Sequence, residues 1–360
     1  MNPLGTTLAD LFAHNCWANA KIGSLCAGLS TDQLEAELPI GMGTFRATYW
    51  HICGAEEAWL ARWQGVAMDP SSFHEVRSVE ETTERLQAVD RARQEFLAGR
   101  SAEELRGVIS YRNFAGSEFS QPLAGLALHV ANHGVHHRAQ LLQFLKQQNR
   151  CVPGGLDYIF YKMSAPTVAI PPDIASRLRA HGLSVGETVT PDRPVDRRVL
   201  EVHQAYGTWM MNRLFEAASG LSDADLDRDF PMGVGTFRKT LTHLLDAENF
   251  WLENYSGHGK PFPQSSVSQS IQELRHGWQS MCERRTAYFA GLRDSQLGDL
   301  VAANFGAGMI HFRIGESMLQ LALHGTHHRA QAINMLRQSG INIGPTDLVV
   351  FLTLTDTMRI

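Results

Sequence analysis

The sequence contains one histidine-rich motif twice: His133-Gly134-Val135-His136-His137-Arg138-Ala139-Gln140 and His324-Gly325-Thr326-His327-His328-Arg329-Ala330-Gln331. A further histidine precedes each copy, His51 in the first half of the chain and His243 in the second. A lone motif of this kind suits a surface or capping role, because helices often carry His and Arg near their C-terminal ends. Two copies with a matched upstream histidine are hard to obtain by chance, so the first hypothesis is metal binding.

The repeat extends beyond the histidines. The stretch Ile40–Arg46 (IGMGTFR) matches Met232–Arg238 (MGVGTFR) at an offset of 192 positions, from 40 to 232. Four more pairs keep this offset: Trp17 and Trp209, His51 and His243, Glu56 and Glu248, and Trp59 and Trp251. The histidine-rich motifs lie 191 positions apart, from 133 to 324. Because solenoid repeats are far shorter, this self-similarity indicates a duplicated domain.

The composition is that of ordinary globular domains. The chain has 360 residues, which suggests about two domains, and 44% of its residues are hydrophobic. A net charge of −5 gives no basic surface for nucleic acid. No apolar stretch approaches the ~20 residues of a membrane span, and the N-terminus lacks the pattern of a secretory signal. We therefore expect a cytoplasmic protein that binds neither nucleic acid nor membrane, with its five cysteines as buried thiols.

Hydrophobic periodicity predicts a helical chain. The predicted helices of the first half span about 5–27, 44–65, 79–98, 120–147 and 156–163. Those of the second half span about 196–218, 236–256, 267–291, 316–338 and 347–358. Four long helices per half indicate a bundle, and a proline-rich stretch between the halves indicates a linker. The prediction is an all-α chain of two tandem four-helix bundles, over residues 1–165 and 195–360, joined by a linker over 166–194.

The spacing within each motif suits metal ligation. Residues four apart project from the same face of a helix, so the first and last histidines of the motif can share one ion. The third ligand has to come from another helix, where the upstream histidine is the candidate. Three neutral imidazoles leave at least one coordination position open, as in catalytic rather than structural zinc sites. The predicted ligand sets are His51, His133 and His137 in the first half, and His243, His324 and His328 in the second.

Three other repeated positions could support such a site. The middle histidine of the motif points about 100° away from the last ligand, so it either contacts the ligands or lines a pocket. The glutamate five residues after the upstream histidine either accepts a hydrogen bond from a ligand or stays on the surface. The arginine of the motif either anchors an anionic group of a substrate or forms a structural ion pair. These positions are His136, Glu56 and Arg138 in the first copy, and His327, Glu248 and Arg329 in the second.

Segments of both copies match the motifs of a known protein family. They are Trp17-Ala18-Asn19, His51–Trp59 (HICGAEEAW) and Asn132–Gln140 (NHGVHHRAQ) in the first copy, and His243–Trp251 (HLLDAENFW) and His324–Gln331 (HGTHHRAQ) in the second. The chain resembles the DinB/YfiT-like family of four-helix-bundle metalloenzymes over nearly its whole length. The resemblance implies that the metal-binding histidines are the two sets already reached from spacing. Because single-domain relatives often pair, it also implies either a monomer with an internal pseudo-dimer or a homodimer.

Each half ends in a short segment that is similar to the final element of this family. The two segments begin Asp157-Tyr158-Ile159-Phe160 and Asp347-Leu348-Val349-Val350-Phe351. Their aspartates either cap a short helix or orient a metal ligand, and capping is the favoured interpretation.

The family resemblance also bears on function. Characterised members include transferases and isomerases that use low-molecular-weight thiols, and others are described as metal-dependent hydrolases. Imidazole ligands suit divalent zinc or nickel first, with iron or copper as alternatives. The sequence has no repeated Ser or Cys near the histidines, so the expected nucleophile is a thiol or water held by the metal. We expect a transferase that uses a small thiol on a small-molecule substrate; the alternatives are a metal-dependent hydrolase and a non-enzymatic metal-binding stress protein.

Overall fold

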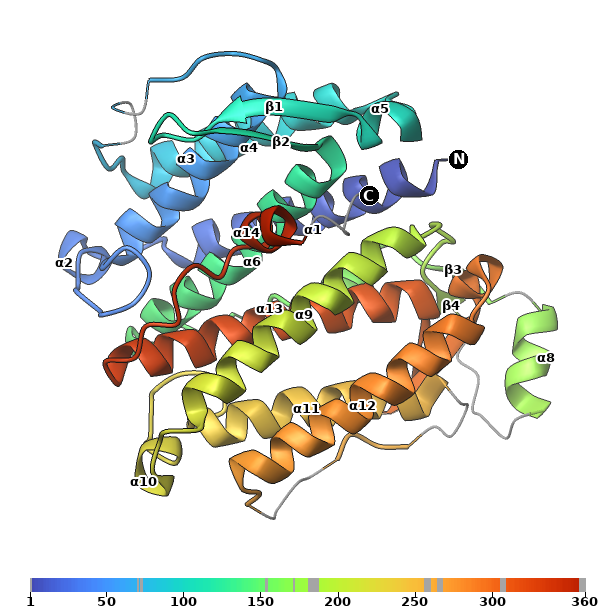
Figure 1. Cartoon of the computed structure of the whole chain (residues 1–360). Helices are drawn as coiled ribbons and strands as arrows, with labels where there is room; N and C mark the ends of the chain where they lie inside the picture. Colours follow the sequence, from blue (N-terminus) through green and yellow to red (C-terminus); the bar gives the residue numbers. More distant parts are fainter. Residues whose placement is uncertain are drawn as a thin grey trace. The chain divides into compact units, whose positions relative to one another are not determined.

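The chain forms two compact units (Figure 1). The computed structural model describes residues 2–69, 71, 74–152, 155–170, 172–180, 188–255, 260–263, 268–304 and 309–355. One unit consists of Met1–Leu156 with Ile333–Ile360, and the other of Asp157–Ala332. Each is built around four long helices, so the all-α fold class and the tandem arrangement are confirmed.

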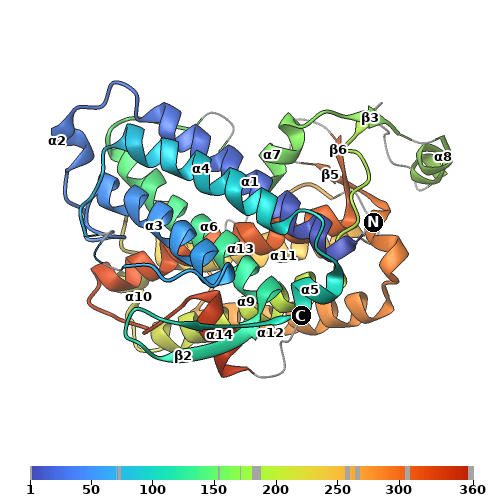
Figure 2. The same cartoon turned by 90° about the horizontal axis from the view of Figure 1, so that it is seen from above.

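The first unit is a four-helix bundle. Its long helices are α1 (Pro3–Leu25), α3 (Phe45–Trp63), α4 (Val79–Leu97) and α6 (Leu123–Gln147). Helices α4 and α6 each pack against both α1 and α3, and Figure 2 shows the four helices running alongside one another. Most residues of α6 are buried, including several polar ones such as Asn132, Arg138 and Gln140, so α6 places polar side chains inside the bundle.

Side-chain caps fix where these helices begin. The Ser78 hydroxyl accepts a hydrogen bond from the Glu81 amide at 3.1 Å at the start of α4. Thr44 accepts one from the Ala47 amide at 3.1 Å at the start of α3. A cap of this kind contributes about 1 kcal/mol, because it satisfies an amide that the helix leaves without a partner. The short helices α2 (Thr31–Leu34) and α5 (Ala102–Arg106) begin with complete capping boxes.

Short elements complete the first unit. Strands β1 (Val108–Arg112) and β2 (Glu118–Pro122) form an antiparallel hairpin that contacts α3 and α6. Tyr111 of this hairpin packs edge-on against Trp59 of α3, with ring centroids 5.0 Å apart. Helix α14 (Leu348–Leu354) packs on α6.

The second unit repeats this arrangement. Its long helices are α9 (Arg197–Ala218), α11 (Phe237–Tyr255), α12 (Ile271–Gly291) and α13 (Ile314–Gln338). The end of α13, from Ile333 onward, belongs to the first unit. Its short elements are α7 (Tyr158–Ser164), β3 (Val168–Ala169), α8 (Pro172–Ala180), β4 (Thr188–Val189), α10 (Asp223–Leu226), η2 (Asp294–Gly298), β5 (Leu300–Asn304) and β6 (Met309–Arg313). Strand β3 pairs with β4 and β5 with β6, both antiparallel.

The last helix of each repeat lies in the unit that the other repeat forms. Helix α7 follows the first repeat in sequence but belongs to the second unit, and α14 ends the second repeat but belongs to the first unit. A buried ion pair of 2.7 Å between Lys162 and Glu316 joins α7 to α13. Gln121 of β2 donates a hydrogen bond of 2.6 Å to Thr353 of α14. The two repeats therefore exchange their final segments.

The ten predicted helices all have counterparts in the structure, with ends that differ by a few residues. Residue 256 of the helix predicted over 236–256, residue 267 of that predicted over 267–291 and residues 356–358 of that predicted over 347–358 lie outside the described residues. The two hairpins β1–β2 and β5–β6 were not predicted, because strands of five residues give a weak periodic signal. The predicted linker contains β3, α8 and β4, while its residues 171 and 181–187 lie outside the described part. Among the described helices, none is long and apolar enough to span a membrane.

Candidate metal centre

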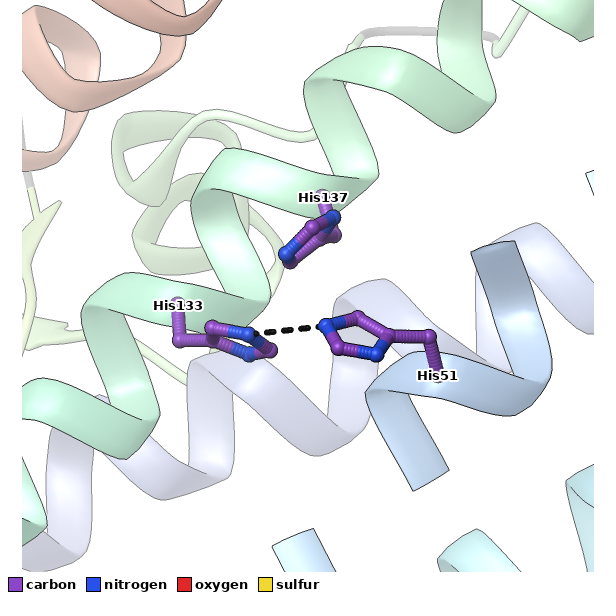
Figure 3. Close-up of side chains that lie close together, drawn as sticks. All are labelled: His51, His133 and His137. Carbon is purple, nitrogen blue, oxygen red and sulfur yellow. Dashed lines mark hydrogen bonds between the residues drawn. The ribbon is translucent and has the colours of Figure 1, made fainter. Parts of the chain in front are cut away.

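Three histidines from two helices meet in the first unit (Figure 3). His51 comes from α3, and His133 and His137 lie one turn apart on α6. The Nε2 atoms of His51 and His133 are 3.2 Å apart. The ring centroid of His137 lies 4.5 Å from that of His51 and 4.3 Å from that of His133. The structure thus brings the three predicted ligands together, with one ring nitrogen of each within 4.8 Å of the others.

The second unit holds the same constellation. His243 comes from α11, and His324 and His328 lie one turn apart on α13. The Nε2 atoms of His243 and His324 are 3.1 Å apart. The ring centroid of His328 lies 4.5 Å from that of His243 and 4.4 Å from that of His324. The two triads are therefore close geometric copies of each other.

The distances between ring nitrogens suit a metal ion. Around a tetrahedral ion with Zn–N bonds of about 2.0–2.1 Å, two ligand nitrogens lie roughly 3.3 Å apart. The Nε2 separations of 3.2 Å and 3.1 Å match this value. Without an ion, such a contact requires a proton on one of the two nitrogens, because two lone pairs repel. The donor set therefore fits a divalent ion.

A repeated glutamine orients the last histidine of each triad. The Nδ1 atom of His137 donates a hydrogen bond of 2.7 Å to Gln140 Oε1, and that of His328 donates one of 2.8 Å to Gln331 Oε1. Because an amide oxygen only accepts, Nδ1 carries the proton and Nε2 keeps a free lone pair for a metal. A role for these glutamines was not predicted, although their recurrence in both copies is a signal for one.

The repeated glycine loop makes room for these glutamines. Gly41 has φ +54°, and a Cβ atom there would lie 2.8 Å from Gln140 Oε1. Gly233 has φ +50°, and a Cβ atom there would collide with Gln331 Oε1. Both the left-handed backbone and the close approach favour glycine over residues with a side chain. The loop motif of the repeat is thereby linked to the triad through one hydrogen bond.

The first triad borders a cavity of about 470 Å³. His51 and His133 lie in its wall, together with α3 residues and the turn of the β1–β2 hairpin. The Arg62 guanidinium lies 4.7 Å from the ring centroids of both Trp59 and Phe114, so a cation is held in the same wall. A cavity of this volume suits a small-molecule ligand.

Comparison with known proteins agrees with this geometry. The sequence model of the DinB family matches residues 2–173 and, a second time, residues 200–359. The chain belongs to the DinB family. Protein DinB of Bacillus subtilis (strain 168) is 24% identical to it over 167 residues, which cover 43% of this chain and 94% of that protein. No solved structure gives a significant match.

Burial favours the neutral imidazole at five histidines of the triads: His51, His133, His137, His243 and His328. Burial lowers the pKa of His243 to about 4, and it also lowers the pKa of His51. The pKa values of His133 and His137 lie well below 6.5, first because of burial and then because each would feel a charge on the neighbouring histidines. The neutral form is the one that binds a metal ion.

An aspartate from the end of the first repeat contacts the histidine triad of the second unit. Asp157 Oδ2 accepts a hydrogen bond of 2.9 Å from Nδ1 of His324. Burial alone would raise the pKa of Asp157, but the hydrogen bond from His324 holds it well below its usual range. Asp157 precedes α7, and its side chain makes no capping hydrogen bond there. The favoured capping interpretation was therefore wrong for this side chain, which orients a ligand histidine instead.

The corresponding aspartate of the first unit is placed differently. Asp347 precedes α14, also makes no capping hydrogen bond with its side chain, and lines the cavity beside His51 and His133. Within the part of the chain that the structure describes, the Asp347 carboxylate has no hydrogen bond to a triad ring. The surroundings of the two triads therefore differ in the contact made by this aspartate.

The remaining predicted positions fall into two groups. The middle histidines contact the glutamines: Gln140 Nε2 donates a hydrogen bond of 3.3 Å to His136 Nε2, and Gln331 does the same to His327 at 2.9 Å. The glutamates and arginines of the repeat make their hydrogen bonds to groups other than the triad histidines, separately in each unit. This second group consists of Glu56, Arg138, Glu248 and Arg329.

The Asp157→Asn substitution tests the hydrogen bond to His324. Loss of such a carboxylate partner typically weakens metal affinity by about 10–100-fold, because the ring loses orientation and basicity. A His137→Ala background leaves the second triad as the one complete site, and competition with a chromophoric chelator then measures its affinity.

Asp347→Asn in a His328→Ala background is the matched control. It should change the affinity of the first triad less than Asp157→Asn changes that of the second, since Asp347 has no hydrogen bond to a triad ring. Equal affinities of the Asp157→Asn variant and its parent would contradict an orienting role for Asp157.

Acid should destabilise the metal-free fold. Burial lowers the pKa of His129, His136 and His203 to about 4, below the ~6.5 of an unfolded chain. The unfolded state therefore binds more protons between pH 6.5 and 4, and stability present above pH 6.5 is lost as the pH falls through this window. Each such histidine removes about 1.4 kcal/mol per pH unit. Urea unfolding of chelator-treated protein at several pH values measures this slope, and a flat profile from pH 7 to 5 would contradict it.

Proposed function

We propose that this DinB protein binds one divalent metal ion at each triad and uses it to activate a low-molecular-weight thiol for transfer to an electrophilic small molecule. The observation that carries the proposal is the convergence of three imidazoles beside a cavity of about 470 Å³. Zinc and nickel are the first candidates, and iron and copper the alternatives, because imidazole suits all four. Such an ion, when bound, lowers the pKa of a thiol or water at its open position.

The protein's own groups prepare the site for this chemistry. Gln140 holds the His137 ring with Nε2 free, and Asp157 does the same for His324. The aromatic residues Trp59 and Phe114 border the first cavity. These side chains orient the ligand rings and shape the space beside them, while the reacting groups enter from outside.

The chain supplies no evident side-chain nucleophile at the first triad. None of the described residues that line the cavity is a Ser or a Cys. Burial raises the pKa of the Cys16 and Cys26 thiols to about 12, and that of Cys53 beyond its ordinary range. These thiols stay protonated and weakly nucleophilic near neutral pH. This supports a nucleophile that arrives as a small molecule.

The cavity lining supports a substrate with an anionic group. Arg62 holds a positive charge in the wall, while His51 and His133 mark the reacting end. Guanidinium groups bind carboxylates in a fixed two-point geometry, so a thiol or electrophile with a carboxylate would be oriented between them. The expected partner is thus a small molecule rather than nucleic acid or membrane. The expected assembly is a monomer with an internal pseudo-dimer, or a homodimer.

A metal-dependent hydrolase is the second candidate. The observation in its favour is Asp347, whose carboxylate lines the same cavity as His51 and His133. A carboxylate in this position can take a proton from an attacking water. Hydrolysis of an ester or amide without any thiol would favour this candidate, and metal binding without turnover of either kind would favour a non-enzymatic metal-binding protein.

Elemental analysis of untagged protein should find one metal ion per triad. His137→Ala and His328→Ala each remove one ligand, and each should lose one of the two ions. His74→Ala changes the lining of the first cavity but no triad ligand, so this control should keep both ions. Failure to load stoichiometric zinc or nickel, even after reconstitution, would contradict metal binding.

Turnover of an electrophile with each candidate thiol tests the proposed reaction. The His51→Ala/His243→Ala double variant should lose about 10²-fold or more in rate, as when a group that stabilises developing charge is removed. His276→Ala, on the exposed face of α12, is the matched histidine control and should keep full activity. Equal rates for the double variant and the wild type would remove the metal from the mechanism.

A further inference from the structure

A buried cluster of charged side chains lies next to the triad motif in the first unit. Its charged members are Glu56, Asp90, Arg93 and Arg138, all buried. Arg93 forms ion pairs with both carboxylates. Asn15 donates a hydrogen bond to Glu56 and accepts one from Arg138. Two guanidinium groups and two carboxylates balance, so this cluster carries no net charge.

The second repeat keeps three of these charges and loses the fourth. Glu248, Arg285 and Arg329 stand where the first repeat has Glu56, Arg93 and Arg138. Arg285 donates a hydrogen bond of 2.7 Å to Glu248, which reproduces the pair of Arg93 and Glu56 with the same spacing in sequence. Among the changed positions are Asp90 to Cys282, Asn15 to Gly207, Asn19 to Met211 and Leu11 to His203, each 192 positions apart.

The loss of the aspartate leaves an unbalanced charge. The Sγ atom of Cys282 lies 3.7 Å from Nη2 of Arg285. The first repeat has the carboxylate of Asp90 at this position. Burial raises the pKa of the Cys282 thiol, so this group is neutral at physiological pH. One carboxylate now faces two guanidinium groups, and the cluster carries a net charge of about +1. A buried charge without a partner is strongly unfavourable.

A cavity of about 30 Å³ lies among α9, α11, α12 and α13. His203, Glu248, Arg285 and Arg329 line it together with Gly207. Gly207 stands at the position of Asn15, whose side chain makes two hydrogen bonds in the first cluster. The second cluster has no side chain at this position. A cavity of this volume holds roughly two water molecules, or a single ion of chloride size.

Several buried polar atoms in the lining have no hydrogen-bond partner among the described residues. Both ring nitrogens of His203 and the Nε atom of Arg329 have no hydrogen-bond partner among the described residues, and these side chains are 3% and 5% exposed. Arg329 donates one hydrogen bond of 3.1 Å to Thr326, a neutral group. Glu248 Oε2 is also without a partner, but Arg285 already balances its charge. The unbalanced charge therefore belongs to Arg329.

We propose that this cavity of the second unit binds one small monovalent anion, of the size of chloride, with Arg329 as its counter-charge and His203 as a neutral donor. The anion takes the electrostatic role that Asp90 has in the first cluster. Burial, followed by the charge of Arg329, lowers the pKa of His203 to about 4, so its ring offers one N–H and no charge. The proposal does not depend on a metal at either triad.

Thermal unfolding of the full chain after chelator treatment tests the proposal, with sodium chloride replacing sodium gluconate at constant ionic strength. Gluconate is too large for the cavity, so it serves as the inert anion. Binding to the folded state should raise Tm by about 5 °C once chloride exceeds its dissociation constant about tenfold, and Tm should then keep rising with the logarithm of the chloride concentration. Excess line width in ³⁵Cl NMR, measured on the same samples, reports chloride binding directly.

Two substitutions at one position separate charge from packing. Cys282→Asp restores the carboxylate of the first cluster and should abolish both the chloride-dependent rise in Tm and the excess line width. Cys282→Ser changes the side chain without adding charge and should retain both. Gly207→Asn provides a second variant: its Cβ atom would lie 3.4 Å from Arg329 Nη1, an ordinary contact, and its amide should fill the cavity and displace the anion.

Each remaining outcome counts against the proposal. A wild-type Tm that does not depend on chloride would mean that the cavity holds water alone. An equal chloride effect in the wild type and in Cys282→Asp would place the anion elsewhere on the protein. Loss of the effect in Cys282→Ser as well would assign it to packing rather than to charge.

Discussion

Each triad depends on one protonation constraint. A histidine that binds a metal through Nε2 has to carry its proton on Nδ1, and an acceptor at Nδ1 enforces this tautomer. Gln140 and Gln331 supply that acceptor to the last histidine of each triad. The glutamines in turn occupy the space that Gly41 and Gly233 leave free. A loop glycine with a left-handed backbone conformation thus leaves room for the glutamine side chain that orients a ligand ring.

The two repeats share the triads and glutamines but differ in what surrounds them. Asp157 binds His324 directly, whereas Asp347 lines a cavity beside the first triad without a hydrogen bond to it. Because α7 and α14 are exchanged, each of these aspartates comes from the repeat that does not supply the histidines. Separation of the two repeats would therefore remove a neighbouring carboxylate from each triad while leaving its three imidazoles in place.

Much of this architecture follows from local sequence signals, and the rest does not. The i, i+4 pair of His133 and His137 predicts a shared face, and the structure brings both to His51. Strong periodicity likewise predicts the long helices, while the five-residue strands give too weak a signal. The partner of Asp157 could not be predicted, because the exchange of final segments is a property of packing rather than of local sequence. The role of Gln140 depends on a side-chain distance, although its recurrence in both copies points to one.

The contrast between triad and charged cluster shows which constraints a duplicated domain can relax. A triad needs three nitrogens at separations set by one ion, so the loss of any ligand removes the site, and both repeats retain all three. The cluster needs only a balance of buried charge, which several arrangements can satisfy. Asp90 provides that balance in the first repeat, and under our proposal a small anion provides it where Cys282 stands in the second. A metal site therefore requires each of its ligand side chains. A buried charged cluster requires only that its total charge be close to zero, so its individual residues can differ.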